Sequence, residues 1–347
     1  MAPSKAMLGS PTAKEARLYA KLAGGKVMCG LCERRCVIPD SGRGFCKTRI
    51  NVAGKLHTLV YGSISAVSVN PIEKKPFFHY RPGSKALTFS SLSCNFSCPW
   101  CQNWELSRSS PGADVGNFVG ADRMVSLALS RGCQSLSVSF NEPTLLFDYC
   151  VDLFPAARRS GLGANFVSNG YMTEEALAML REAGMDAIKF DVKGDSGVYE
   201  DFCGGARAEV VWRNAKRAKD SGLHVEVVNL VIPGVNDDDA CVDWIVGEHL
   251  KNLGPEVPLH FTRYHPTRWF GSPPTPVSAL ERAREVARKA GVLYAYVGNV
   301  PGHRFENTWC PACGELLVER RGFEAVRMKL SKERRCPRCG NGVPIVL

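Results

Sequence analysis

Long apolar segments are absent from this chain. Its longest apolar runs, such as the one around residues 225–235, are interrupted by Asn229, Pro233 and Gly234. They fall well short of the roughly 20 residues that a transmembrane helix needs. The N-terminal stretch MAPSKAMLGSPTAKEARLYAKL also lacks the apolar centre of a secretory signal peptide. We therefore predict a cytoplasmic protein without a membrane span.

The chain also lacks internal repeats, low-complexity tracts and a concentrated basic face. Its formal net charge is +10, but the basic residues are scattered and the RR and KK runs are short. Such a distribution is typical of a solvated surface, so nucleic acid is not the favoured partner. With 347 residues and 45% hydrophobic content, the sequence predicts one large domain with small appendages.

Short apolar runs alternate with amphipathic stretches in the middle of the chain. They predict strands at 86–91, 135–140, 163–168, 186–192, 224–232, 258–264 and 292–297, with helices near 122–131, 173–184, 209–221, 238–252 and 278–290. This α/β alternation implies a parallel sheet wrapped by helices, either a partial (β/α)6 TIM-like barrel or an open doubly wound sheet. In both architectures functional residues collect at the carboxyl ends of the strands.

Composition divides the chain into four segments. Thr12 and Glu15 form a capping-box pattern, so residues 1–25 are predicted to form an N-terminal helix. Residues 26–85 are rich in Cys, Gly and Pro and predict a small four-cysteine module. Residues 86–304 predict the α/β core, and residues 305–347 predict a second small metal-stapled module.

Fifteen cysteines in a chain predicted to be cytosolic indicate metal ligands rather than disulfides, because cytosolic thiols stay reduced. In SLSCNFSCPWCQNWE, residues 91–105, Cys94, Cys98 and Cys101 are followed by no further cysteine before Cys133. Three thiolates on a four-iron cube leave one iron open to a substrate or cofactor. The alternatives are a zinc site with a distant ligand, or three cysteines packed in the core.

The C-terminal segment carries two CPxCG knuckles, WCPACGELL and RCPRCGNGV. They pair Cys310 with Cys313 and Cys336 with Cys339. Paired CxxC spacing of this kind predicts a zinc ribbon, with a rubredoxin-type iron centre as the competing interpretation. We expect the ribbon to have a structural role.

The N-terminal module, CGLCERRCVIPDSGRGFC, supplies Cys29, Cys32, Cys36 and Cys46. Four thiolates can close a tetrahedral zinc site or hold an auxiliary iron–sulfur cluster. The spacing does not decide between zinc and a second cluster, and zinc is our first choice.

The CxxxCxxC loop, with Trp100 before its third cysteine, resembles the cluster loop of the radical S-adenosylmethionine superfamily. The resemblance implies that Cys94, Cys98 and Cys101 are catalytic and hold a [4Fe-4S] cluster whose open iron binds S-adenosylmethionine. Reductive cleavage then gives methionine and a 5′-deoxyadenosyl radical, which abstracts hydrogen from a substrate.

Further stretches at successive strand ends resemble elements of the same superfamily. SFNEPT (139–144) resembles its GGEP element, with Phe140 and Asn141 in place of the glycines, and VSNGY (167–171) resembles the TNG turn of glycyl-radical activating enzymes. FDVKG (190–194), VIPGVND (231–237) and RYHP (263–266) resemble later elements of those enzymes. The resemblance implies cofactor contacts from Asn141, Glu142, Ser168, Asn169, Asp191, Lys193 and His265.

Two of these residues allow a geometric expectation. Asp191 and Lys193 are two positions apart in a predicted strand, so their side chains share one face, and Lys193 suits the cofactor's carboxylate. Val167 and Val228 stand where the pyruvate formate-lyase activator has an aspartate and an arginine. The cofactor chemistry therefore carries over more readily than the protein substrate.

Over nearly its full length the chain resembles the AmmeMemoRadiSam group, which is similar to pyruvate formate-lyase activating enzyme. The supporting motifs include NPIEKKPFFHYRPG (70–83) and GNVPGH (298–303). Lys74, Lys75 and His79 in the first of them either line the substrate entrance or belong to a packing segment. The group resemblance implies a Memo-like protein as a candidate partner, and the chemistry calls for a reduced donor such as ferredoxin or flavodoxin.

The predicted function is therefore that of a radical oxidoreductase acting on an unidentified substrate, for which a protein is one candidate, as in glycyl-radical activation. One alternative is a radical enzyme that modifies RNA. Another is a non-catalytic protein that binds zinc or an iron–sulfur cluster.

Overall fold

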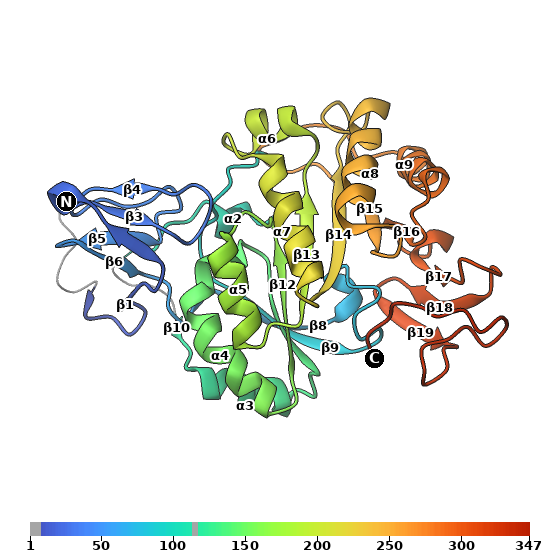
Figure 1. The fold of residues 1–347 in the computed structure, drawn as a ribbon, viewed down its shortest axis with the longest axis horizontal. Coiled ribbons are helices and arrows are strands. Elements are labelled where there is room, and N and C mark those ends of the chain that lie inside the picture. Colours follow the sequence, from blue (N-terminus) through green and yellow to red (C-terminus); the bar gives the residue numbers. More distant parts are fainter. Residues whose placement is uncertain (1–7, 113–116) are drawn as a thin grey trace. The chain divides into compact units, whose positions relative to one another are not determined.

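The computed structural model describes residues 8–112 and 117–347 (Figure 1). They divide into two compact units, one of residues 8–69, 86–112 and 117–186, the other of residues 70–85 and 187–347. Within the described ranges, no helix combines the length and the apolar character needed to cross a membrane. The predicted α/β class is confirmed, with mostly parallel strands and a four-cysteine cluster near the C-terminal end.

The core of the first unit consists of parallel strands flanked by helices. The strands are β9 (Lys85–Ser90), β11 (Ser135–Val138) and β12 (Gly163–Ser168). In register, Ser135 of β11 lies opposite Ala86 on one side and Gly163 on the other. Helices α3 (Ala121–Ser130), α4 (Phe147–Arg159) and α5 (Glu174–Ala183) lie side by side (Figure 1).

Helix α4 is the main element of this core that the sequence pattern does not predict. Pro155 lies inside it and interrupts the helical pattern. The helix follows a 3-10 turn, Pro143–Leu146, in which the side chain of Glu142 accepts from the amide of Thr144. The buried apolar side chains on α4, among them Leu153 and Phe154, therefore outweigh the helix-breaking tendency of the proline.

The N-terminal part of the first unit consists of small antiparallel sheets and short strands. Strands β1 (Lys14–Glu15), β6 (Lys55–Thr58) and β5 (Arg49–Val52) form one sheet, and β2 (Tyr19–Lys21), β3 (Val27–Cys29) and β4 (Val37–Ile38) form another. Strand β7 (Ser63–Ile64) pairs with β10 (Asn117–Phe118). Strand β8 (Ala66–Pro71) leads into residues 70–85, which belong to the second unit. Helix α2 (Trp104–Ser107) follows the loop that carries Cys94, Cys98 and Cys101.

The N-terminal helix predicted for residues 1–25 is wrong over residues 10–25, and residues 1–7 lie outside the described part. The hydroxyl of Thr12 contacts that of Ser10 at 2.9 Å instead of capping a helix. Lys14 and Glu15 pair with residues 57–58 of β6. A capping-box pattern cannot reveal this pairing, because the partner strand lies far along the chain.

The second unit repeats the α/β pattern. Its parallel strands are β13 (Ala187–Val192), β14 (His224–Val231), β15 (Leu259–Arg263) and β16 (Ala295–Gly298). The helices between them are α6 (Ser196–Phe202), α7 (Ala208–Asp220), α8 (Asp239–Leu253) and α9 (Val277–Ala290). Asp238 caps α8 by accepting from the amide of Cys241, and Gly291 ends α9 with φ 111°. The predicted helices near 209–221, 238–252 and 278–290 are thus confirmed.

The C-terminal module adds a three-stranded antiparallel sheet of β17 (Thr308–Trp309), β18 (Leu316–Arg321) and β19 (Glu324–Met328). Its apolar core includes Leu317, Val318 and Ile345, and Phe78 and Tyr296 pack into the same cluster. Phe78 belongs to the segment of residues 70–85, which is part of the second unit. The four segments predicted from the sequence stay a prediction, because the two compact units divide the chain in another way and do not test those boundaries.

Candidate active site

The loop after β9 carries Cys94, Cys98 and Cys101, each half-buried. Ser93 starts the loop with φ 75°, in the left-handed region, and its hydroxyl donates to the carbonyl of Cys46 at 2.6 Å. The amide of Phe96 lies 3.4 Å from Cys94 Sγ. Amide groups directed at sulfur are one means by which proteins tune iron–sulfur sites.

The three thiols are neighbours without forming a compact single-ion site. Burial raises the pKa of Cys94 well above the usual range, and negative charge on Glu142, Cys98 and Cys101 would raise it further. Within residues 8–112 and 117–347, only another set of cysteines has all its sulfur atoms within 4.8 Å of one another. Thiolates on a cube bind different irons and stand farther apart than ligands of one ion. The donor set of this loop therefore fits a cluster.

The end of β11 is tied to the cysteine loop by Asn141. Its Nδ2 donates to the carbonyl of Ser93 at 2.9 Å, and its Oδ1 accepts from the amide of Ser91 at 3.2 Å. Phe140, immediately before it, has φ 71°, a conformation that favours glycine. This is a position at which the resembling element has a glycine, the residue that adopts such a φ at the lowest cost.

Glu142 joins the ends of β11 and β12. Its Oε1 accepts from Ser168 Oγ at 2.7 Å, Thr144 Oγ1 at 2.6 Å and the Thr144 amide at 3.0 Å. Its Oε2 accepts from the amide of Asn169 at 2.9 Å. Burial raises the pKa of Glu142, while these donors favour the ionised form and oppose the rise. The carboxylate is buried, and both of its oxygens accept hydrogen bonds from protein groups.

Asn169 links this network to the cysteine loop. Its Nδ2 donates to Asn95 Oδ1 at 2.7 Å and lies 3.9 Å from Cys94 Sγ. Gly170 follows with φ 74°, which the Asn-Gly turn requires. Sequence reasoning missed Asn95 and Ser93, because both are variable-type positions beside the cysteines of the loop and act through long-range contacts.

In the second unit, β13 presents three charged side chains on one face. Asp191 forms an ion pair with Lys189, and its Oδ2 lies 3.7 Å from Lys193 Nζ. Burial would raise the pKa of Asp191, but the two lysines outweigh it and lower the pKa. Lys189 was not predicted, although the alternating KFDVK pattern places it on the face of Asp191 and Lys193.

The other predicted elements of the second unit are a structured turn and a polar loop. Asn236 in VIPGVND is fully buried, and its Nδ2 donates to the carbonyl of Lys193 at 2.5 Å. The turn after β14 thus fixes the backbone after β13. His265 follows β15 and is exposed.

The segment 70–83 acts in packing. The amides of Phe78 and His79 donate to Glu226 at 2.9 and 2.7 Å, and His79 Nε2 lies 2.6 Å from the hydroxyl of Tyr296. Burial lowers the pKa of His79 to about 3, so this ring is neutral. Of the two interpretations of the segment, packing is the one that these contacts support.

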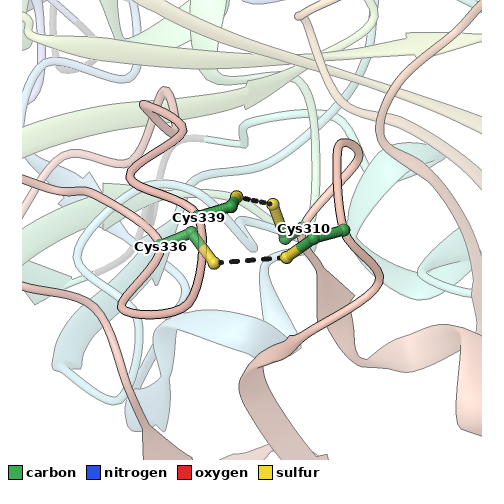
Figure 2. A group of neighbouring side chains, drawn as sticks. Cys310, Cys336 and Cys339 are labelled. Carbon is green, nitrogen blue, oxygen red and sulfur yellow. Dashed lines mark hydrogen bonds between the residues drawn. The ribbon is translucent and has the colours of Figure 1, made fainter.

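The C-terminal cysteines form a compact metal site. The sulfur atoms of Cys310, Cys313, Cys336 and Cys339 all lie within 4.8 Å of one another. The sulfur atoms of the pairs Cys310–Cys339 and Cys313–Cys336 are each 3.6 Å apart. Figure 2 shows the knuckle of Cys336 and Cys339 facing the knuckle of Cys310. Against burial, the amides of Cys339 and Arg338 lower the pKa of Cys336 to about 7. This arrangement suits one tetrahedrally coordinated ion.

The N-terminal module brings its predicted ligands together as well. Cys29, Cys32, Cys36 and Cys46 line one cavity in the first unit. Asn95, from the loop that carries Cys94, lines the same cavity.

Comparison with known proteins places these features in a family. Residues 89–244 match the family model of the Radical SAM superfamily. The chain is 39% identical over 336 residues to an uncharacterized protein of Methanocaldococcus jannaschii, an alignment that covers 96% of this chain and 100% of that protein. It is 24% identical over 152 residues to GTP 3′,8-cyclase of Campylobacter curvus, covering 42% of this chain and 46% of that enzyme.

The fold also resembles a solved structure. A radical SAM methyltransferase from Sphaerobacter thermophilus superposes with a TM-score of 0.51 at 13% identity, covering 82% of this chain and 76% of that chain. At this level of identity the likeness concerns the fold alone.

Proposed function

Because the chain belongs to the radical S-adenosylmethionine superfamily, we propose that Cys94, Cys98 and Cys101 hold a [4Fe-4S] cluster at which S-adenosylmethionine is cleaved. When bound and reduced, the cluster supplies the electron that breaks the sulfonium bond to give methionine and a 5′-deoxyadenosyl radical. The protein is then an oxidoreductase that removes hydrogen from a substrate. The substrate is unidentified, and a protein, as in glycyl-radical activation, is one candidate.

One observation supports this proposal most strongly. Glu142, Asn169 and Cys94 form a continuous chain of contacts from the ends of two parallel strands to the cysteine loop. Strand ends are where α/β folds place their chemistry. A purely structural metal site would not need the carboxyl ends of β11 and β12 arranged around one of its ligands.

We propose different roles for the predicted cofactor-binding residues of the first unit. The oxygens of Glu142 and the amide of Asn141 already bond to protein groups, so we assign both residues to positioning the loop. Ser168 likewise uses its hydroxyl on Glu142. Asn169 lies beside Cys94 and is the residue of this group best placed to contact the cofactor.

In the second unit we assign the cofactor carboxylate to Lys193. Lys189 is the closer of the two lysines to Asp191, and Lys193 lies at 3.7 Å, a distance at which a carboxylate ligand can compete for its ammonium group. Asp191 stays ionised and keeps the two lysines oriented. His265, exposed after β15, is a second candidate contact.

The proposal includes further components. Zinc in the Cys310–Cys339 ribbon would stabilise the C-terminal module. A low-potential donor of the ferredoxin or flavodoxin class would reduce the cluster. The cytoplasm is the proposed location, and a Memo-like protein is the proposed partner.

The test is anaerobic formation of 5′-deoxyadenosine by reconstituted, dithionite-reduced protein. Wild type should release it together with methionine, and Cys98→Ala should release none. Cys133→Ala is the matched control, because Cys133 is a buried cysteine outside the loop and should keep wild-type cleavage. Full cleavage by Cys98→Ala, or none by wild type with a complete cluster, would contradict the proposal.

A further inference from the structure

The four N-terminal cysteines surround a space instead of meeting at a point. Cys29, Cys32 and Cys46 are buried and Cys36 is half-buried. They line a cavity with about 300 Å³ of space not filled by atoms, part of it open to solvent. The same cavity is lined by Arg34, Arg49 and Asn95.

The C-terminal ribbon provides an internal reference for a zinc site. Four sulfur atoms about 2.3 Å from one zinc ion lie about 3.8 Å apart, which leaves no space between them. The ribbon sulfurs approach this arrangement, with pairs at 3.6 Å and all four within 4.8 Å. No three of the N-terminal thiols form such a set in the part of the chain that the structure describes. Their wider spacing suits ligands of separate irons.

Two buried donors also line this cavity without a complete hydrogen bond within the described ranges. Asn95 is fully buried, and its Oδ1 accepts a hydrogen bond from Asn169 Nδ2. This bond identifies which atom of the Asn95 amide is the oxygen, and the remaining atom is therefore the donor Nδ2. Asn95 Nδ2 has no partner at full hydrogen-bond geometry among the described residues, and it is directed at the sulfur of Cys32, one of the four cysteines. Such a donor is costly to bury unless something accepts its hydrogen bond.

Arg49 supplies the second donor. Its Nη1 donates to Asp148 at 2.5 Å, while its buried Nε has no acceptor within the described ranges. A zinc ion brings no acceptor of its own, whereas the inorganic sulfides of an iron–sulfur cluster do.

We propose that Cys29, Cys32, Cys36 and Cys46 hold an auxiliary iron–sulfur cluster with several irons, in place of the zinc that was the first choice from the sequence. The guanidinium groups of Arg34 and Arg49 balance the charge of four thiolates. Asn95 Nδ2 and Arg49 Nε donate to its sulfur atoms.

The auxiliary site is connected directly to the loop of Cys94. Ser93 donates to the carbonyl of Cys46 at 2.6 Å, and Arg34 Nε donates to the carbonyl of Asn95 at 2.5 Å. Asn169 contacts both Asn95 and Cys94. Charge at one site therefore acts on the other through one short loop. This coupling rests on the proposed function, whereas the metal content of the site does not.

The test separates the two sites. Cys94→Ala/Cys98→Ala/Cys101→Ala, anaerobically reconstituted with iron and sulfide, should keep about four irons and four sulfides per chain, and wild type about eight of each. Reduction should give an electron paramagnetic resonance signal in the triple variant. Cys36→Ser in the wild-type background is the complementary variant and should lose about half of the iron.

A triple variant that contains zinc and no sulfide would overturn the inference. A well-folded triple variant that contains neither zinc nor an iron–sulfur cluster would also overturn it. If the triple variant does not fold by circular dichroism, the wild-type count decides: about four irons overturns the inference, and about eight supports it. Asn95→Leu adds a second measurement. Removing a donor to the cluster sulfur should make the potential of the auxiliary signal more negative. These results leave the cleavage test of the Cys94 loop independent.

Discussion

The substitution Glu142→Gln tests the network behind Cys94 with little change of shape. Each carboxylate oxygen accepts from one backbone amide, Thr144 N on Oε1 and Asn169 N on Oε2. A glutamine must turn its NH2 group toward one of them. Because Oε1 also accepts from two hydroxyls, the less costly orientation places the NH2 against the amide of Asn169.

The magnitude follows from that lost bond. A buried donor left without an acceptor costs about 1–3 kcal/mol, and a hydrogen bond to a charged group contributes about 1.5–3 kcal/mol. We therefore expect the free energy of unfolding to fall by about 2–3 kcal/mol in Glu142→Gln. Urea unfolding of metal-free protein, followed by circular dichroism, measures it. Glu105→Gln is the control, because Glu105 is exposed in the same unit, and its change should stay within about 0.5 kcal/mol.

A second readout distinguishes positioning near the cluster from general stability. The charge of Glu142 acts on Cys94, so removing it should make the reduction potential of the Cys94 cluster less negative. A Glu142→Gln protein as stable as wild type, with an unchanged potential, would refute the role assigned to this carboxylate.

Two further predictions concern parts outside the site. Cys310→Ala should lose the ribbon metal and lower the thermal midpoint before cleavage is affected, as metal analysis and thermal scans can show; lost cleavage at unchanged stability would contradict it. Burial lowers the pKa of His249 to about 4, so the folded ring resists a proton that the unfolded chain accepts below about pH 6.5. The free energy of unfolding should therefore decrease as the pH is lowered. Between pH 7.5 and pH 5, wild type should lose about 2 kcal/mol more of it than His249→Gln loses. Equal losses in the two proteins would refute this prediction.

Local patterns were sufficient for most of the α/β core. Continuous apolar runs marked buried parallel strands such as β12, and capping residues marked helices such as α5, which begins after Thr173 and ends at Gly184. The paired CxxC spacing likewise predicted the ribbon cluster, because its ligands are close in sequence within each knuckle.

Long-range contacts account for what the sequence did not reveal. The strand at Lys14–Glu15 depends on β6, and helix α4 depends on packing that overrides Pro155. Asn95 appears as an ordinary loop residue until Asn169 and the cysteine cavity are placed around it. Side chains whose role comes from such partners have no local signal, and a single sequence does not reveal them.

The most direct test of the open iron is electron–nuclear double resonance on the reduced protein with S-adenosylmethionine labelled with 17O in its carboxylate, because the superfamily resemblance implies that the open iron binds the amino and carboxylate groups of the methionine portion. The account predicts a hyperfine coupling from the label that is present in Cys36→Ser and absent in Cys94→Ala/Cys98→Ala/Cys101→Ala. A reduced cluster on the Cys94 loop that shows no coupling at saturating S-adenosylmethionine would contradict it.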